Sequence, residues 1–175
     1  MKSISILVIV FVMLVSFAQN DKPVKTVKYV DLKKYVGHWY EISKIPNRFQ
    51  KQCVSNATAK YILDEDGDMK VVNSCTDDEG ELDVAEGVAK VVDKKSNAKL
   101  EVSFVSFLGI RPFWGDYWII GLDENYKWAV IGTPDRKYGW VLGRTPQLDN
   151  VTVQKINSIL KENGYDTEAF IQSKQ

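Results

Sequence analysis

Between residues 38 and 144 the chain repeats one pattern: short runs of alternating apolar and polar side chains, separated by turns rich in Gly, Asp and Asn. In one clear case Leu100, Val102 and Phe104 alternate with Glu101 and Ser103. A period of two is typical of β-strands with one buried face. Its repetition at short intervals favours an antiparallel barrel or sandwich. The eight predicted strands are 38–44, 57–63, 69–74, 82–92, 99–104, 117–122, 128–132 and 138–144.

The period changes after residue 150. An apolar stripe with a period of about 3.6 residues predicts one amphipathic helix; its members are Val153, Ile156, Ile159 and Leu160. We expect this helix to begin at a cap on Asn150 and to end at Gly164. The 175 residues are enough for one domain with a sizeable core.

The first predicted strand opens on an unusual run, Gly37-His38-Trp39-Tyr40. Glycine admits backbone angles that a Cβ would forbid, and a tryptophan at a strand entrance can close one end of a barrel. Strict alternation then places Trp39, Glu41 and Ser43 on one face and Lys44 on the other. Glu41 is therefore expected to face inward as a lone carboxylate that forms hydrogen bonds at the barrel floor.

Small residues are opposed to large ones on the predicted inner faces, with Ala57, Ala59, Gly87 and Ala89 as the small set. An eight-stranded barrel encloses either packed side chains or one small ligand, and small wall residues favour the ligand. A tapered, fully packed barrel is the alternative. The ligand-lining residues predicted from strand parity are Tyr61, Phe104, Tyr117 and Trp140.

The N-terminus has the pattern of a targeting segment. Lys2 precedes an apolar run over 4–15, and Ser16-Phe17-Ala18 offers small residues at a cleavage site. This pattern predicts a signal peptide over 1–18, an arm over 19–30 and one domain over 31–175. Export to a periplasm, cell envelope or extracellular space follows, with an uncleaved membrane anchor as the alternative. No cysteine at the cleavage point offers a site for lipid attachment.

The two cysteines of the chain, Cys53 and Cys75, flank a glycine-containing turn over 64–67. Because a hairpin would bring them together and an exported protein meets an oxidising compartment, we expect a disulfide between them. Closing a loop of about 22 residues stabilises the fold by roughly 3 kcal/mol. Two free thiols are the alternative.

The connection between the fifth and sixth predicted strands, 104–114, is unusually apolar for a loop. Strand count places it at the open end of a barrel. We expect it to form the cavity mouth and to touch lipid surfaces or lipid tails, unless it folds over its own barrel. Its large apolar residues are Phe107, Leu108, Ile110, Phe113 and Trp114.

Composition argues against several functions. Lys and Arg number 23 and Asp and Glu number 23, so no net field attracts nucleic acid. A hydrolytic triad or multi-histidine metal centre cannot be built from the single histidine, His38. The sequence also has no phosphate-binding glycine loop. We therefore predict no catalytic residue, no metal site and no cofactor.

Three motifs together resemble those of the lipocalin family, within it most closely the group of bacterial lipocalins, plant temperature-induced lipocalins and apolipoprotein D. Gly37-His38-Trp39-Tyr40-Glu41 resembles G-x-W-Y-E, the turn 121–126 resembles the D-x-x-Y hairpin, and 140–146 resembles W-I-L-S-R-T-P. The resemblance spans about 31–170. It implies an up-and-down barrel, open at one end, with the helix outside. It also implies a structural contact in which Arg144 lies across the indole of Trp39.

The resemblance implies non-enzymatic binding or transport of a small apolar or amphipathic ligand, such as a fatty acid or lysophospholipid, in envelope lipid storage, transport or stress. Two alternatives stay open. One is a lipid-modifying enzyme of the same fold, which would need a reactive thiol or paired carboxylates. The other is a protein-interaction module that uses 104–114, as a monomer or a homodimer.

Overall fold

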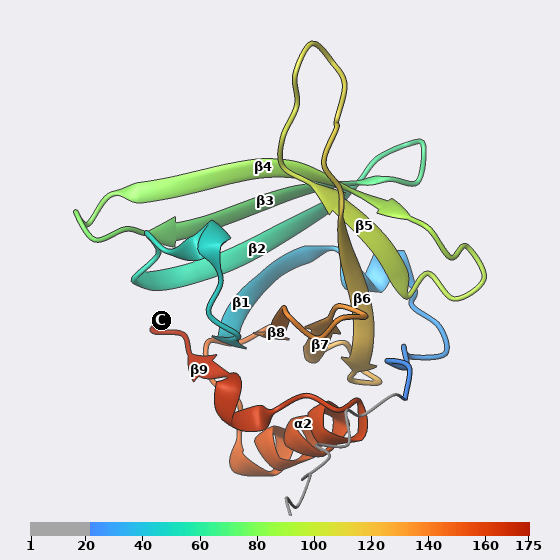
Figure 1. Cartoon of the computed structure of the whole chain (residues 1–175), viewed down its shortest axis with the longest axis vertical. Coiled ribbons are helices and arrows are strands. Elements are labelled where there is room, and N and C mark those ends of the chain that lie inside the picture. Colours follow the sequence, from blue (N-terminus) through green and yellow to red (C-terminus); the bar gives the residue numbers. More distant parts are fainter. Residues whose placement is uncertain (1–21) are drawn as a thin grey trace, which may run out of the picture.

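The computed structural model describes residues 22–175, so the predicted signal peptide lies outside the described residues. Within this range nine strands form one antiparallel sheet that closes into a barrel, and the helix α2 (Asn150–Glu162) packs outside it (Figure 1). The predicted all-β barrel with an external C-terminal helix is therefore confirmed. The strands are β1 (Gly37–Lys44), β2 (Ser55–Leu63), β3 (Met69–Thr76), β4 (Leu82–Val91), β5 (Lys99–Ser103), β6 (Gly115–Leu122), β7 (Trp128–Gly132), β8 (Gly139–Gly143) and β9 (Ile171–Gln172).

The strands β2 to β8 follow one another around the barrel in chain order, and β1 closes it by pairing with both β8 and β2. The β1–β2 pairing ends at Tyr40 opposite Thr58. Beyond that point β9 lies beside β1 in place of β2, with Ile171 opposite Lys44. The sequence pattern did not predict this ninth strand, which seals the barrel wall where β1 and β2 separate.

A register shift in β1 changes which side chains face inward. The pairing of β1 with β8 is irregular between Glu41 and Ser43, so Ser43 lies opposite Val141 and Lys44 opposite Trp140. Val141 belongs to the cluster under α2, whereas Trp140 packs against the cluster inside the barrel. The expectation that Ser43 faces inward and Lys44 outward is therefore wrong, because a bulge adds one residue to the alternation.

Two hydrophobic clusters share the sheet. The inner cluster fills the half of the barrel around Trp39, and the outer cluster lies between the sheet and α2, with Ile156 and Leu160 buried against it. Asp149, not Asn150, caps this helix, because its carboxylate accepts a 2.9 Å hydrogen bond from the Thr152 backbone N–H. Within residues 22–175 no helix is long and apolar enough to cross a membrane.

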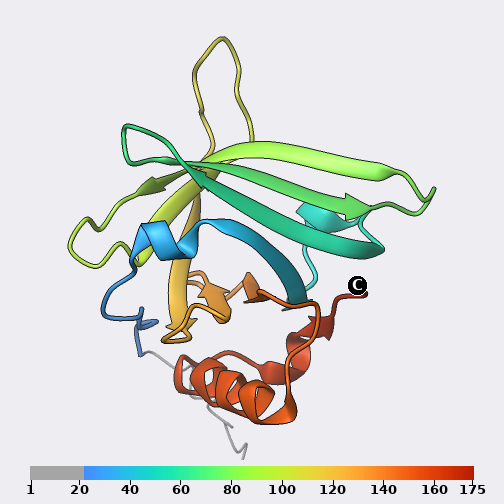
Figure 2. The same cartoon turned by 180° about the vertical axis from the view of Figure 1, so that it is seen from behind.

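The short helix α1 (Leu32–Tyr35) crosses one end of the barrel, as the view from behind shows (Figure 2). Beneath it Trp39 is fully buried, and its indole N–H donates a 2.8 Å hydrogen bond to the Tyr35 carbonyl. The Arg144 guanidinium lies 3.7 Å from the centre of the indole ring. It also donates hydrogen bonds to the carbonyls of Val36 and His38. These contacts close this end of the barrel.

Candidate ligand site in the barrel

The inner wall formed by β2, β3 and β4 is arranged in rows that become more open away from the closed end. Met69 and Val71 are buried, Asn73 is half-buried, and Ala85 is exposed. The closed half is therefore packed, whereas the inner wall of the other half, here called the cup, is accessible to solvent. In order from the closed end the rows are Leu63–Met69–Ala89, Tyr61–Val71–Gly87 and Ala59–Asn73–Ala85, followed by Cys75–Asp83.

Three tyrosines form a hydrogen-bonded floor beneath this cup. The hydroxyl of Tyr117 lies 2.6 Å from that of Tyr35 and 2.8 Å from that of Tyr61. Tyr61 and Tyr117 were both predicted as ligand-lining residues, and the structure places them together at the floor. Burial raises the pKa of Tyr61 to about 12 and raises those of Tyr35 and Tyr117 well above their usual value. The floor is therefore uncharged at neutral pH.

Phe104 lies on the inner wall at the open half. A Cβ added to Gly87 would come 2.7 Å from the Cδ1 atom of Phe104, so the glycine makes room for this ring. Phe104 is 39% exposed. The Phe104 ring is therefore packed on the wall and also accessible from the mouth. The small residue Gly87 and the large residue Phe104, which the sequence predicted on the inner faces, lie next to each other there.

Five side chains, Glu41, Lys44, Gln50, Trp140 and Ser173, form a polar group near the opening, here called the mouth cluster. The Glu41 carboxylate lies 3.0 Å from the Lys44 ammonium and accepts 2.6 Å hydrogen bonds from Gln50 and Ser173. Trp140, the fourth predicted lining residue, donates a 2.9 Å hydrogen bond to the Gln50 side chain. Glu41 thus faces inward, but it is paired with a lysine and bonded to the mouth loop, not to the floor.

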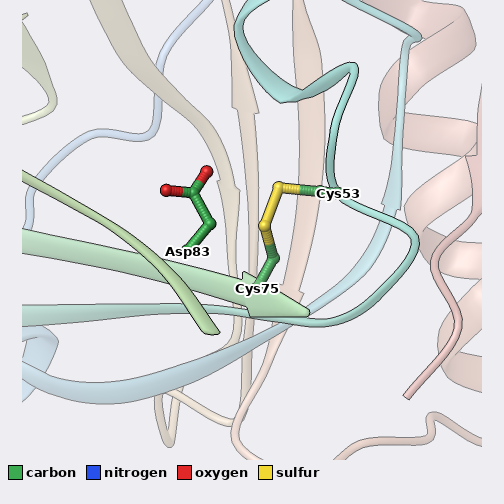
Figure 3. A group of neighbouring side chains, drawn as sticks. All are labelled: Cys53, Cys75 and Asp83. Atoms are coloured by element: carbon green, nitrogen blue, oxygen red, sulfur yellow. A yellow bond between two sulfur atoms is a disulfide. The ribbon is translucent and has the colours of Figure 1, made fainter. Parts of the chain in front are cut away.

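The loop between β1 and β2 reaches across the inner wall at the mouth. Gln52 donates a 2.6 Å hydrogen bond to Asp83 on β4, and Cys53 forms a disulfide with Cys75 on β3 (Figure 3). The predicted disulfide is confirmed. Because each sulfur is bonded to the other, neither offers a thiolate to a metal or a substrate. The bond therefore holds the loop against the wall.

Sequence reasoning missed Lys44, Gln50 and Ser173. Lys44 is turned inward by the bulge, and Gln50 lies in a single-turn 3₁₀ helix, η1 (Arg48–Gln50). Ser173 follows the short β9 strand. None of the three sits in a regular run of alternating residues. The one available signal was the run Ile45-Pro46, which marks the end of regular pairing on β1.

The segment 104–114 forms an arm that projects from the barrel between β5 and β6 and does not fold over the mouth (Figures 1 and 2). Phe107 and Ile110 exchange two 2.9 Å backbone hydrogen bonds, with Leu108 and Gly109 at the tip in left-handed conformations. The exposed fraction is 86% for Leu108 and 71% for Phe107, and Ile110 and Phe113 are also exposed.

The base of the arm is fixed. The Arg111 guanidinium donates a 3.0 Å hydrogen bond to the Ser103 carbonyl, and the Trp114 indole N–H donates one of 2.9 Å to the Arg111 carbonyl. Trp114 is half-buried, with the Lys90 ammonium 5.0 Å from its ring. The arm therefore exposes four large apolar side chains to solvent, while hydrogen bonds hold its base against the barrel.

Comparison with known proteins gives consistent results. The sequence matches the lipocalin-like domain family over residues 30–175. It is 39% identical to temperature-induced lipocalin-1 of Arabidopsis thaliana, covering 84% of this chain and 80% of that protein. It is 36% identical to the outer membrane lipoprotein Blc of Escherichia coli, covering 85% and 81% of the two chains, and 36% identical to mouse apolipoprotein D, covering 83% and 77%.

Solved structures support the fold. Insecticyanin from the tobacco hornworm Manduca sexta superimposes with a TM-score of 0.71 at 23% identity, covering 87% of this chain and 84% of that one. Lobster apocrustacyanin A1 gives a TM-score of 0.65 at 16% identity, with coverage of 82% and 78%. The family match and the identities above 30% over most of each relative, together with this barrel, establish that the chain belongs to the lipocalin family.

Proposed function

We propose that this protein is a non-enzymatic carrier that binds one amphipathic or apolar lipid, such as a fatty acid or lysophospholipid, in its barrel. The observation that carries the proposal is the inner surface: apolar walls above an uncharged tyrosine floor, opening at a polar mouth cluster. Membership of a family that binds small hydrophobic ligands supports it.

The proposed mechanism is burial of the lipid tail. Each methylene that leaves water for the cup contributes about 0.8 kcal/mol. The tail would lie along Ala85 and Phe104, above Tyr61 and Tyr117, while the head group stays near Trp140. These residues face the same lumen, so one acyl chain can contact all of them.

Features of the site favour binding over catalysis. The cysteines are joined in a disulfide, so neither provides a nucleophile. The Glu41 carboxylate is engaged by three side-chain donors, Lys44, Gln50 and Ser173, which hold it in place and leave it no free position toward a substrate. Both features count against the enzyme alternative, which needs a reactive thiol or paired carboxylates in the cup.

The experiment that tests the carrier proposal is a titration of the purified mature protein with dodecanoic acid, followed through tryptophan fluorescence. We expect saturable one-to-one binding with a dissociation constant in the micromolar range or below, because Trp140 lies at the mouth and senses occupancy. A folded protein that gives no saturable signal and does not displace a bound apolar dye would contradict the proposal.

We also propose that the arm contacts lipid surfaces during loading or release. Its support is the exposure of Phe107, Leu108, Ile110 and Phe113 on a projecting hairpin, since contiguous exposed apolar side chains mark membrane or protein contact sites. A protein partner or a second copy of the chain is the competing occupant of this surface.

The double substitution Phe107→Ser, Leu108→Ser should weaken co-sedimentation with phospholipid vesicles by more than about tenfold, because each side chain contributes at least about 1.5 kcal/mol when buried. The matched control is Val151→Ser, Val153→Ser, which removes exposed apolar side chains from α2 and should leave vesicle binding unchanged. Equal vesicle binding by the arm variant and wild type would contradict the membrane role. Concentration-dependent self-association that disappears in the arm variant would favour the protein interface.

The proposed location is outside the cytoplasm, in the cell envelope or secreted, after export through the signal peptide predicted over 1–18. The name of the relative Blc, an outer membrane lipoprotein, supports an envelope setting. Ser16-Phe17-Ala18 is followed by glutamine, not cysteine. We therefore propose that this chain is not anchored through a lipid-bearing cysteine at that point.

A further inference from the structure

Lys44 is a buried cation inside the mouth of the barrel. Its side chain is 10% exposed, and it lies opposite Trp140 on the inner face because of the bulge in β1. An ammonium group has three N–H donors. Within the described residues it meets one acceptor, the Glu41 Oε1 atom at 3.0 Å. Two donors are therefore left without a protein partner in a place that ligand head groups would occupy.

Glu41 accepts from only one of the three N–H donors of the Lys44 ammonium. Its Oε1 atom also accepts a 2.6 Å hydrogen bond from the Ser173 hydroxyl, and its Oε2 atom accepts one of 2.6 Å from the Gln50 amide. Asp83, a second carboxylate at the mouth, is held by Gln52 on the opposite part of the wall. Both carboxylates are thus already hydrogen-bonded, and Glu41 fixes Lys44 in position.

From this geometry we propose that Lys44 is the head-group anchor of the barrel and selects ligands with an anionic oxygen head, a carboxylate or a phosphate monoester. The proposal rests on the carrier function above and names the charge of its ligand. Hydrogen bonds between ionised partners are about twice as strong as neutral ones. A neutral head group of the same chain length would gain less from Lys44.

The test compares three ligands of equal chain length: dodecanoic acid, dodecyl phosphate and 1-dodecanol. Each is titrated into the mature protein at a pH where both acids are ionised. Wild type should bind the two anions about tenfold more tightly than the alcohol. The carboxylate and phosphate arms separate the two possible sources of the anionic head.

Two variants isolate the role of Lys44. The double substitution Lys44→Met, Glu41→Gln removes the ion pair without leaving either charge buried and unpaired. It should abolish the preference for anions and leave alcohol binding unchanged. Glu41→Gln alone removes the competing carboxylate, so it should strengthen anion binding. The control Lys60→Met removes an exposed lysine from β2 and should change nothing.

The outcomes separate this inference from the carrier proposal. Equal affinity for acid, phosphate and alcohol in wild type would overturn the anchor role and leave the carrier function standing. No binding of any of the three by folded protein would overturn both. If Glu41→Gln weakens anion and alcohol binding alike, the pair is only structural and the anchor role is wrong.

Discussion

The substitution Ala85→Trp is expected to reduce affinity for dodecanoic acid by at least about tenfold, because an indole would occupy the space of two or more ligand methylenes at about 0.8 kcal/mol each. Ala85 lies on the inner wall beside Asn73, one row inside Cys75–Asp83 at the mouth, and it is exposed. The larger side chain therefore has room to enter the lumen without disturbing the packed half. A titration in which dodecanoic acid displaces a bound apolar dye measures the loss of affinity.

The neighbouring residue provides a matched control. Val84 lies on the same strand, 47% exposed and opposite Ser74 on the outer face. Val84→Trp adds the same indole one residue away but outside the barrel, so ligand affinity should stay within about twofold of wild type, the size of ordinary surface effects. Equal losses in the two variants, or none in Ala85→Trp, would show that the ligand does not enter the cup.

Trp39→Ala is expected to lower the free energy of unfolding by about 3–5 kcal/mol, the range for removing a fully buried tryptophan. The indole is 0% exposed, donates to the Tyr35 carbonyl and supports the Arg144 guanidinium. Its loss leaves a cavity at the closed end and removes the ring on which the Arg144 guanidinium lies. Urea denaturation measures the change, and the melting temperature should fall by on the order of 10 °C.

A second tryptophan provides the comparison. Trp118 is half-buried on the outside of β6, with the Lys99 ammonium 4.1 Å from its ring. Trp118→Ala should cost about half as much as Trp39→Ala or less, since it empties no enclosed space. If Trp39→Ala does not fold, Trp39→Phe provides the measurement, with a smaller loss expected. Equal losses for Trp39 and Trp118 would contradict the role of Trp39 as the plug of the closed end.

Much of the architecture follows from local patterns. Alternation such as Leu100-Glu101-Val102 specifies strands, and the change of period at residue 150 specifies the helix, because each pattern matches one backbone geometry. The pairing of Cys53 with Cys75 followed from the hairpin between them. These features depend on residues close together in the chain, so the sequence alone was sufficient to predict them.

Features that depend on a single irregular residue were not predictable in this way. One extra residue in β1 turns Lys44 inward, and parity counting has no means of placing it. β9 is too short to show a period, yet it brings Ser173 to Glu41 from the far end of the chain. Strand parity identified two of the three floor tyrosines, Tyr61 and Tyr117, whereas Tyr35 comes from α1 and follows no strand pattern.

The arm was recognised as apolar, but its direction depends on long-range geometry. Its residues predict neither that Phe107 and Ile110 pair into a hairpin nor that this hairpin stands clear of the mouth. Only Phe104 at its start returns to the inner wall, where Gly87 leaves space for the ring. That space is created by another strand, so the sequence of the arm alone does not reveal it.

The most direct test of the carrier account is native mass spectrometry of the mature protein purified from its own source, followed by organic extraction and identification of bound lipid. We predict a stoichiometric adduct of one amphipathic lipid with an acyl chain and an anionic head group. The adduct should be lost in Ala85→Trp and retained in Val84→Trp. An empty protein that also takes up no fatty acid at micromolar concentration would contradict the account.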